Sequence, residues 1–140
     1  AVPGVLMGVR DAAFLKWRFA ECPLRSYKFF ALFSAGDQRL VAYAVCEARE
    51  RVLHVCDFLV ERDRPGAWAR LWMDLSLEAF REGYTSLSLE FLGGEELQRE
   101  LGRAGMAVRD KRPLFASSAV RWEDLMQESH WYMTCADEDG

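Results

Sequence analysis

Two acidic side chains near the middle of the chain are candidates for proton transfer. Asp57 stands inside the apolar segment 52–60 (VLHVCDFLV), and Glu61 follows that segment directly. A carboxylate placed within reach of a substrate proton can act as a general base. Asp57 could instead mark the exposed end of a strand or accept a hydrogen bond from a backbone amide, and Glu61 could be a surface charge. The residues alone favour these structural interpretations.

The next segment, 61–69 (ERDRPGAWA), could bind an anion. Arg62 and Arg64 supply positive charge, and Gly66 would let the backbone approach a ligand closely. Arg-Pro-Gly is equally ordinary turn chemistry, in which the arginines are only solvated. Both interpretations stay open at this point.

Cysteine and histidine give little support to a metal site. The cysteines form no C-x-x-C pair, and only His54 and His130 could join them, so we predict no metal. Cysteine could be a nucleophile only beside a base. Buried, reduced thiols in a cytoplasmic protein are the preferred interpretation. The four cysteines are Cys22, Cys46, Cys56 and Cys135.

Composition describes a globular domain. The 140 residues are 51% hydrophobic and 13% aromatic, enough for a core, and the net charge of −4 argues against nucleic-acid binding. The chain contains no apolar run of the roughly 20 residues that span a membrane. Its start, Ala1-Val2-Pro3-Gly4, lacks methionine and a signal pattern, so we expect a piece of a longer protein.

Alternating and helical patterns place these side chains on a mixed fold. The helix over 11–22 should begin at an Asp11 cap and stop at Pro23, and Ala35 to Gln38 should form a hairpin turn. In order, the expected elements are a helix over 11–22, strands over 27–34, 39–48 and 52–60, a helix from Pro65 to Gly83, a strand over 84–91, a helix over 95–103, and a strand or hairpin within 106–119.

The helix that ends at Gly83 has the clearest pattern. Pro65 suits its first turn, and Gly83 suits the position just after its end. One apolar stripe is expected to face the core. Its members are Trp68, Leu71, Trp72, Leu75, Ala79 and Phe80.

The order of elements resembles the GNAT N-acyltransferase superfamily over about residues 11–119. The phrase FLKWRF near the start and the phrase WYMT before an acidic end resemble divergent members. The resemblance implies an α/β (α+β) fold, with a mixed, mostly antiparallel central sheet flanked by helices. It also implies one domain over 1–140, with an aromatic and acidic tail over 120–140. In that tail we prefer packing of the aromatics as a final strand, with solvated acids, over an acceptor site.

GNAT proteins splay the fourth strand from the fifth at a bulge, and acetyl-CoA or another acyl-CoA enters the gap. Its pyrophosphate then lies on backbone N–H groups at the start of the next helix, which carry a positive dipole. Here the loop fits as Arg64-x-x-Ala67-x-Ala69 or, less well, as Asp63-x-x-Gly66-x-Trp68. The implied cofactor-binding residues are Phe58, Leu59, Val60, Arg62, Arg64, Gly66, Ala67, Trp68 and Ala69.

The resemblance also implies roles for acids and bases. Asp57 or Glu61 stands near the position of the general base. Leu101 stands where the family often has a tyrosine that protonates the leaving thiolate, and leucine cannot donate a proton. Tyr132 is the remaining candidate acid.

The implied function is acyl transfer, most simply of acetyl, from acyl-CoA to a small-molecule amine or peptide. The missing tyrosine and the incomplete glycine pattern favour an alternative, a non-catalytic binding module that pairs with a second GNAT-like lobe or a second copy. An unrelated α/β ligand-binding domain is a third interpretation, and it requires that strand 52–60 does not splay from strand 84–91.

Overall fold

The structure is a computed structural model that describes residues 6–7, 11–61, 63–64, 66–111, 131–134 and 137. Residues 6–7 and 131–133 are described by their backbone alone. The chain divides into two compact units. The larger unit comprises Val9–Phe91 and Thr134–Gly140, and the smaller comprises Ala1–Gly8 and Leu92–Met133. The single domain expected from the sequence stays a prediction.

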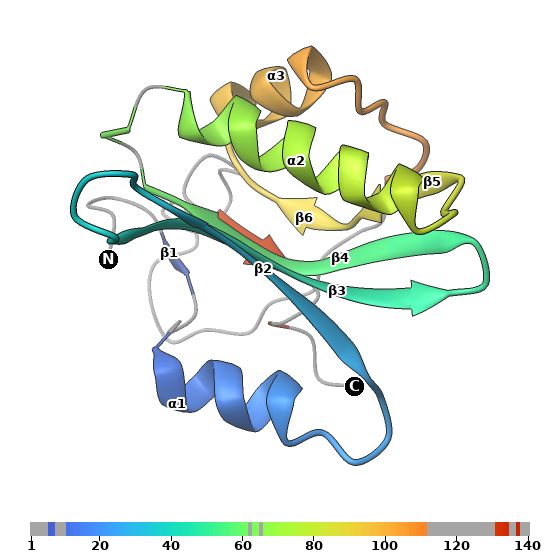
Figure 1. Ribbon diagram of the computed structural model, residues 1–140. Helices are drawn as coiled ribbons and strands as arrows, with labels where there is room; N and C mark the ends of the chain where they lie inside the picture. The colour runs from blue at the N-terminus through green and yellow to red at the C-terminus, as the bar shows by residue number, and fades with distance from the viewer. Residues whose placement is uncertain are drawn as a thin grey trace, which may run out of the picture. The chain divides into compact units, whose positions relative to one another are not determined.

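A four-stranded sheet forms the centre of the larger unit, in the order β2-β3-β4-β5 (Figure 1). β2 to β4 are antiparallel neighbours, and β5 joins β4 in parallel. The predicted mixed, mostly antiparallel sheet is therefore confirmed. The predicted strand 84–91 was too long, because it divides into two short strands. The strands are β2 (Tyr27–Phe33), β3 (Leu40–Arg49), β4 (Val52–Val60), β5 (Ser86–Leu89) and β6 (Phe91–Leu92).

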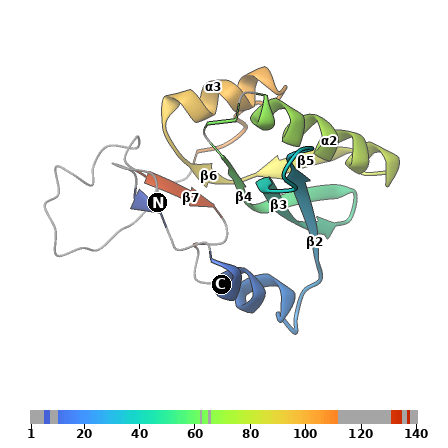
Figure 2. The ribbon, with the colours of Figure 1, turned by 60° about the vertical axis from the view of Figure 1, so that its left-hand side comes forward.

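Helices cover the two faces of this sheet (Figures 1 and 2). α2 (Ala67–Arg81) packs on one face, where Phe58 of β4 is fully buried. α1 (Ala12–Leu15) and the π-helical turn η1 (Lys16–Ala20) lie on the other face. There Phe19 packs against Val45 and Cys56. Each large apolar side chain buried in this way contributes roughly 1.5–3 kcal/mol to folding.

Local capping fixes where the helices begin and end. Asp11 caps α1 as predicted, because its carboxylate accepts from the Phe14 N–H at 2.7 Å. Gly83, at φ +88°, ends α2 in the expected left-handed conformation. The N–H of Gly83 donates to the Phe80 carbonyl, and the N–H of Tyr84 donates to the Ala79 carbonyl, which satisfies the end of the helix.

Three details of the predicted helices were wrong. The helix over 11–22 ends at Leu15 and continues as the wider π turn η1. α2 begins at Ala67 behind a Gly66 cap, later than the predicted start at Pro65, which lies outside the described residues. Phe80 is 81% exposed, because a step of 100° per residue turns it from the core that its neighbour Ala79 faces.

The smaller unit contains α3 and most of a three-stranded sheet. α3 (Glu95–Arg103) matches the predicted bounds and ends before Gly105, at φ +91°. The strand order is β1-β7-β6, with β1 (Leu6–Met7) parallel to β7 (Trp131–Thr134). β7 confirms that the tail aromatics belong to a final strand. Residues 106–111 form no strand, and 112–119 lie outside the described residues.

Within the described part of the chain, no helix combines the length and the apolar character needed to cross a membrane.

Candidate functional site

β4 leaves its neighbour β5 halfway along its length. β3 pairs with β4 from Val52 to Val60, whereas β5 pairs with it only from Val52 to Val55. The register with β3 jumps at this point, and Cys56 is the extra residue of a β-bulge. Among the described residues the second half of β4 therefore pairs with β3 alone, and the splay of β4 from β5 that the GNAT resemblance implies is confirmed. The interpretation as an unrelated α/β domain required an unsplayed pair of strands, and that condition is not met.

Asp57 follows the bulge and is fully buried. Its Oδ2 accepts a hydrogen bond from the hydroxyl of Tyr43 on β3 at 2.7 Å. Its Oδ1 accepts one from the hydroxyl of Thr134 on β7, also at 2.7 Å. Both carboxylate oxygens are thus held by hydroxyl donors, which satisfies the polar atoms of a buried acid. The predicted alternative of an exposed strand end is wrong, and the acid is fixed in place beside the splay.

The acidic tail takes part in the same network. The N–H of Thr134 donates to Oδ2 of Asp137 at 2.9 Å, so this acid orients the residue that holds Asp57. The expectation that the tail acids are only solvated is wrong for Asp137, while 138 and 139 lie outside the described residues. Tyr132 lies in β7 two residues before Thr134, and its side chain is outside the described part.

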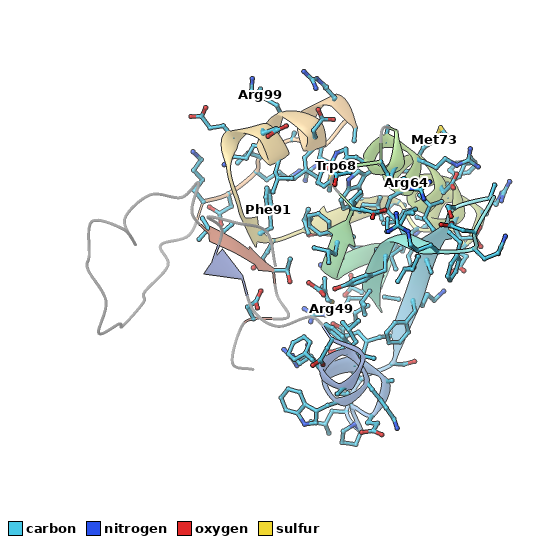
Figure 3. The ribbon with its side chains drawn as sticks, turned by 90° about the vertical axis from the view of Figure 1, so that its left-hand side faces the viewer. Arg49, Arg64, Trp68, Met73, Phe91 and Arg99 are labelled. Atoms are coloured by element: carbon cyan, nitrogen blue, oxygen red, sulfur yellow. The ribbon has the colours of Figure 1, made fainter. Side chains whose placement is uncertain are left out.

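Aromatic rings fill the α2 side of β4 beyond the bulge. Phe58 contacts Trp68, Trp72 and Phe91 edge to face, with ring centroids 5.1 to 6.2 Å apart. The Nε1 atoms of Trp68 and Trp72 are buried, and neither has a hydrogen-bond acceptor among the described residues. Figure 3 labels Trp68 and Phe91. Two buried N–H donors without acceptors are unusual in a folded protein, and a bound molecule could supply the acceptors.

Arg64 lies beside the β2–β3 hairpin and is already paired with acids (Figure 3). Its guanidinium is 3.5 Å from Glu61 and 3.9 Å from Asp37. Arg39 also contacts both acids, at 2.8 Å from Glu61. This cluster of two arginines and two acids carries no net charge. A phosphate at Arg64 would therefore compete with Glu61 and Asp37.

The start of α2 has the geometry of an anion site without the full glycine pattern. Gly66 caps the helix at φ +81°, and no side chain caps the first turn. The N–H of Ala67 donates to the Arg64 carbonyl at 3.2 Å, and Ala69 is exposed. Arg62 lies outside the described residues. Helix N–H groups without side-chain caps are what an anion would use here.

The remaining reactive groups have structural roles. Leu101 is buried in α3, where its apolar side chain packs in the core. Cys46 and Cys56 are buried, as predicted, and neither forms a disulfide with another described cysteine. Burial raises the pKa of the Cys46 thiol to about 12, with a smaller contribution from neighbouring Cys56, so this thiol stays protonated near neutral pH. The described residues contain no group of three metal-ligand side chains.

Sequence reasoning missed the residues that hold Asp57. Tyr43 lies in the predicted strand 39–48, two residues before Val45. The pairing of Val45 with Asp57 across the sheet brings Tyr43 close to the Asp57 carboxylate, and this pairing is not visible in the sequence. Thr134 is 77 residues from Asp57 along the chain, a separation that carries no local pattern. The sequence held one signal for Thr134, because this residue belongs to the phrase WYMT, which together with the acids after it supported the GNAT resemblance.

Comparisons with known proteins add little beyond the fold. Neither the family models nor the curated proteins contain a match to this chain. A crystal structure named "putative acetyltransferase from Agrobacterium tumefaciens" aligns with TM-score 0.49 and 18% identity, over 79% of this chain and 88% of that chain. At this similarity no activity or site residue can be transferred. The strand order, the β-bulge and the splayed β4–β5 pair show a mixed, mostly antiparallel sheet flanked by helices, as expected from the sequence.

Proposed function

We propose that the chain is an acyl-CoA-dependent N-acyltransferase that moves an acyl group, most simply acetyl, to an amine. The observation that carries the proposal is the splay of β4 from β5 after Val55. Among the described residues it leaves Phe58 to Val60 without a strand on one side, directly after a buried acid and a few residues before the N-terminus of α2. A linear ligand with an amide-rich arm and a phosphate end fits these three features.

In the proposed reaction the amine nitrogen attacks the thioester carbonyl carbon. The N–C bond forms, the C–S bond breaks, and backbone N–H groups of Phe58 to Val60 stabilise the developing oxyanion. The amine proton passes to the Tyr43 oxygen as the hydroxyl proton of Tyr43 moves to Oδ2 of Asp57, 2.7 Å away. Water or Tyr132 protonates the leaving thiolate. Glu61 is the weaker candidate base, because Arg39 and Arg64 already engage it.

The two indoles support the same placement. Trp68 and Trp72 lie in the first two turns of α2, and their buried N–H groups find no acceptor in the part of the chain that the structure describes. Carbonyl oxygens of a ligand in the splay would satisfy them. Trp72→Phe removes the N–H and keeps an aromatic ring against Phe58, so it should weaken ligand binding. The smaller ring also leaves a cavity in the core, so the stability of the free protein is measured alongside and the binding loss is read from the dissociation constant of the folded variant.

Thermal unfolding with acetyl-CoA tests the proposal. We expect millimolar acetyl-CoA to raise the melting temperature, because a ligand that binds only the folded state stabilises it. Arg64→Glu should abolish the shift. Arg51→Glu makes the same charge change at the other end of β4 and should keep it. The absence of any shift with the unchanged chain would overturn the proposal.

A non-catalytic binding module is the second candidate, and two observations favour it. The charge of Arg64 is balanced by Glu61 and Asp37. Leu101 also stands at the sequence position where the GNAT resemblance expects a proton-donating tyrosine, and leucine cannot donate a proton. Release of free CoA thiol from acetyl-CoA, measured with a panel of primary amines, separates the two. A thermal shift with no thiol release supports the module, and thiol release that Tyr43→Phe abolishes supports the enzyme.

A further inference from the structure

A groove of about 500 Å³ lies between β2 and α2, within the larger unit. Leu71 and Leu75 of α2 are buried at its base, and Phe30 and Leu32 of β2 form its apolar wall. None of these residues belongs to the splay or to the Asp57 network. The groove is therefore a separate feature from the proposed acyl-transfer site.

The strand that borders the groove is an edge strand with few of the usual features that prevent further strand pairing. β2 is the first strand in the sheet order, and within the described ranges only β3 pairs with it. Every second residue of such a strand turns its backbone N–H and C=O away from the sheet. Edge strands are normally protected by charges or proline. β2 carries a single charge, Lys28, which is ion-paired with Glu82, the residue that directly follows α2.

Apolar side chains also remain exposed along β2. Phe29 and Phe33 are each more than half exposed. Phe29 stands opposite Val45, which packs against Phe19 on the α1 face, and it is also among the residues that line the groove. An edge strand with open backbone groups and exposed phenylalanines tends to acquire another strand. A strand added here would bury apolar surface on both faces of the sheet.

The helix side of the groove is acidic. Asp74, Glu78 and Glu82 follow one another at four-residue intervals along α2 and line the groove. Lys28 is the single cation in the lining, so the lining carries two net negative charges. Arg70 contacts Asp74 at 2.8 Å and Arg81 contacts Glu78 at 3.7 Å, but neither arginine lines the groove. Such exposed pairs are weak and leave acceptor capacity on each carboxylate.

We propose that this groove binds an extended peptide segment, which joins β2 as an additional strand and points a lysine or arginine at Asp74 and Glu78. Backbone hydrogen bonds to β2 supply affinity for any extended segment. The groove accepts every second side chain, which should be apolar to match Leu71 and Leu75. The acidic row selects a basic residue at one of these positions. The inference does not depend on acyl transfer.

Hydrogen exchange with a defined peptide pool tests the proposal. The pool consists of blocked eight-residue peptides in which one fixed lysine stands among mixed valine, isoleucine and leucine at every second position, with threonine between. With the full chain, we expect slower amide exchange over 27–33 and saturable binding of the fluorescein-labelled pool below about 1 mM. A second pool with norleucine in place of lysine measures the charge contribution.

Matched variants identify the surface. Asp74→Asn with Glu78→Gln should weaken lysine-pool binding about fivefold and leave norleucine-pool binding unchanged. Glu95→Gln with Glu96→Gln removes the same charge from exposed positions on α3 and should change neither. These variants alter only exposed or half-exposed side chains, and the thermal shift with acetyl-CoA reports separately on the acyl-transfer site.

Two outcomes would overturn the proposal. Without a partner peptide, protection over 27–33 that grows with protein concentration together with a doubled mass would show that a second copy occupies the edge. No protection over 27–33 at the solubility limit of the lysine pool would show that the edge does not accept a strand.

Discussion

Asp57 and Glu61 are the same kind of group, four residues apart, in opposite surroundings. Asp57 has no exposed surface, and two hydroxyls from other strands hold its oxygens. The Glu61 side chain is 30% exposed and shares two arginines with Asp37. Water can replace every partner of Glu61, whereas nothing can replace the partners of Asp57 without a rearrangement of the sheet.

The contrast separates two tasks at the end of β4. The buried network fixes the position of the Asp57 carboxylate, because Tyr43, Asp57 and Thr134 each belong to a different strand. The exposed cluster sets local charge, because its side chains can exchange partners at little cost. A substitution should therefore act through stability in the first region and through ligand charge in the second.

Asp57→Ala should give the largest effect. It leaves the Tyr43 and Thr134 hydroxyls without their acceptor, so we expect the free energy of unfolding to fall by about 3 kcal/mol, measured by urea titration. Glu61→Ala is the control and should cost less than about 0.5 kcal/mol. Equal losses of unfolding free energy for the two variants would show that the buried and the exposed acid do not differ in their contribution to stability.

Removal of either hydroxyl should give an intermediate effect. Tyr43→Phe and Thr134→Val each delete one hydrogen bond to a carboxylate and keep the shape, at a cost of about 1.5 kcal/mol. In the Asp57→Ala background both losses should shrink, because the shared partner is gone. Additive losses would mean that Asp57 is not the link between the two hydroxyls.

The arginine of the exposed cluster should matter little for stability. Arg64→Ala is expected to change the free energy of unfolding by less than about 0.5 kcal/mol, and 1 M NaCl should make the difference smaller by screening the exposed pairs. A loss of more than about 1 kcal/mol would show that the cluster is structural.

The smallest effect concerns pH and Asp37. Its pKa is lowered from 3.8, first by the hydrogen bond from Ser34 and then by the backbone N–H of Arg39. A lowered folded-state pKa adds stability above the unfolded value, and this stability is lost as pH falls through the folded value. Asp37→Asn should therefore melt slightly below the unchanged chain at pH 6 and equally at pH 2. A difference that persists at pH 2 would contradict this.

Short-range features of the fold could be predicted from sequence because their causes are short-range. The Asp11 cap, the Gly83 and Gly105 helix ends and the bounds of α3 depend on a few neighbouring residues. The π turn and the exposure of Phe80 could not be predicted, since each depends on how a helix meets the sheet.

The candidate site divides in the same way. Asp57 could be found because an acid inside an apolar strand is conspicuous, and the splay followed from the GNAT resemblance. The ion pairs of Arg64 could not, because they require that the hairpin turn approach the loop after β4. Tyr43 and Thr134 depend on the bulge and on a strand from the far end of the chain.

The contact between Thr134 and Asp57 also has a consequence for biosynthesis. A ribosome that adds about 5–20 residues per second needs roughly 4–15 s to pass from one residue to the other, because 77 positions separate them. Throughout that interval Asp57 lacks one of its two hydroxyl donors. Either water solvates the carboxylate in a partly folded sheet, or the sheet around Asp57 forms only after Thr134 has been synthesised. Arrest of translation just before and just after Thr134, followed by limited proteolysis of the nascent chain, would show whether β4 becomes protected only at the end.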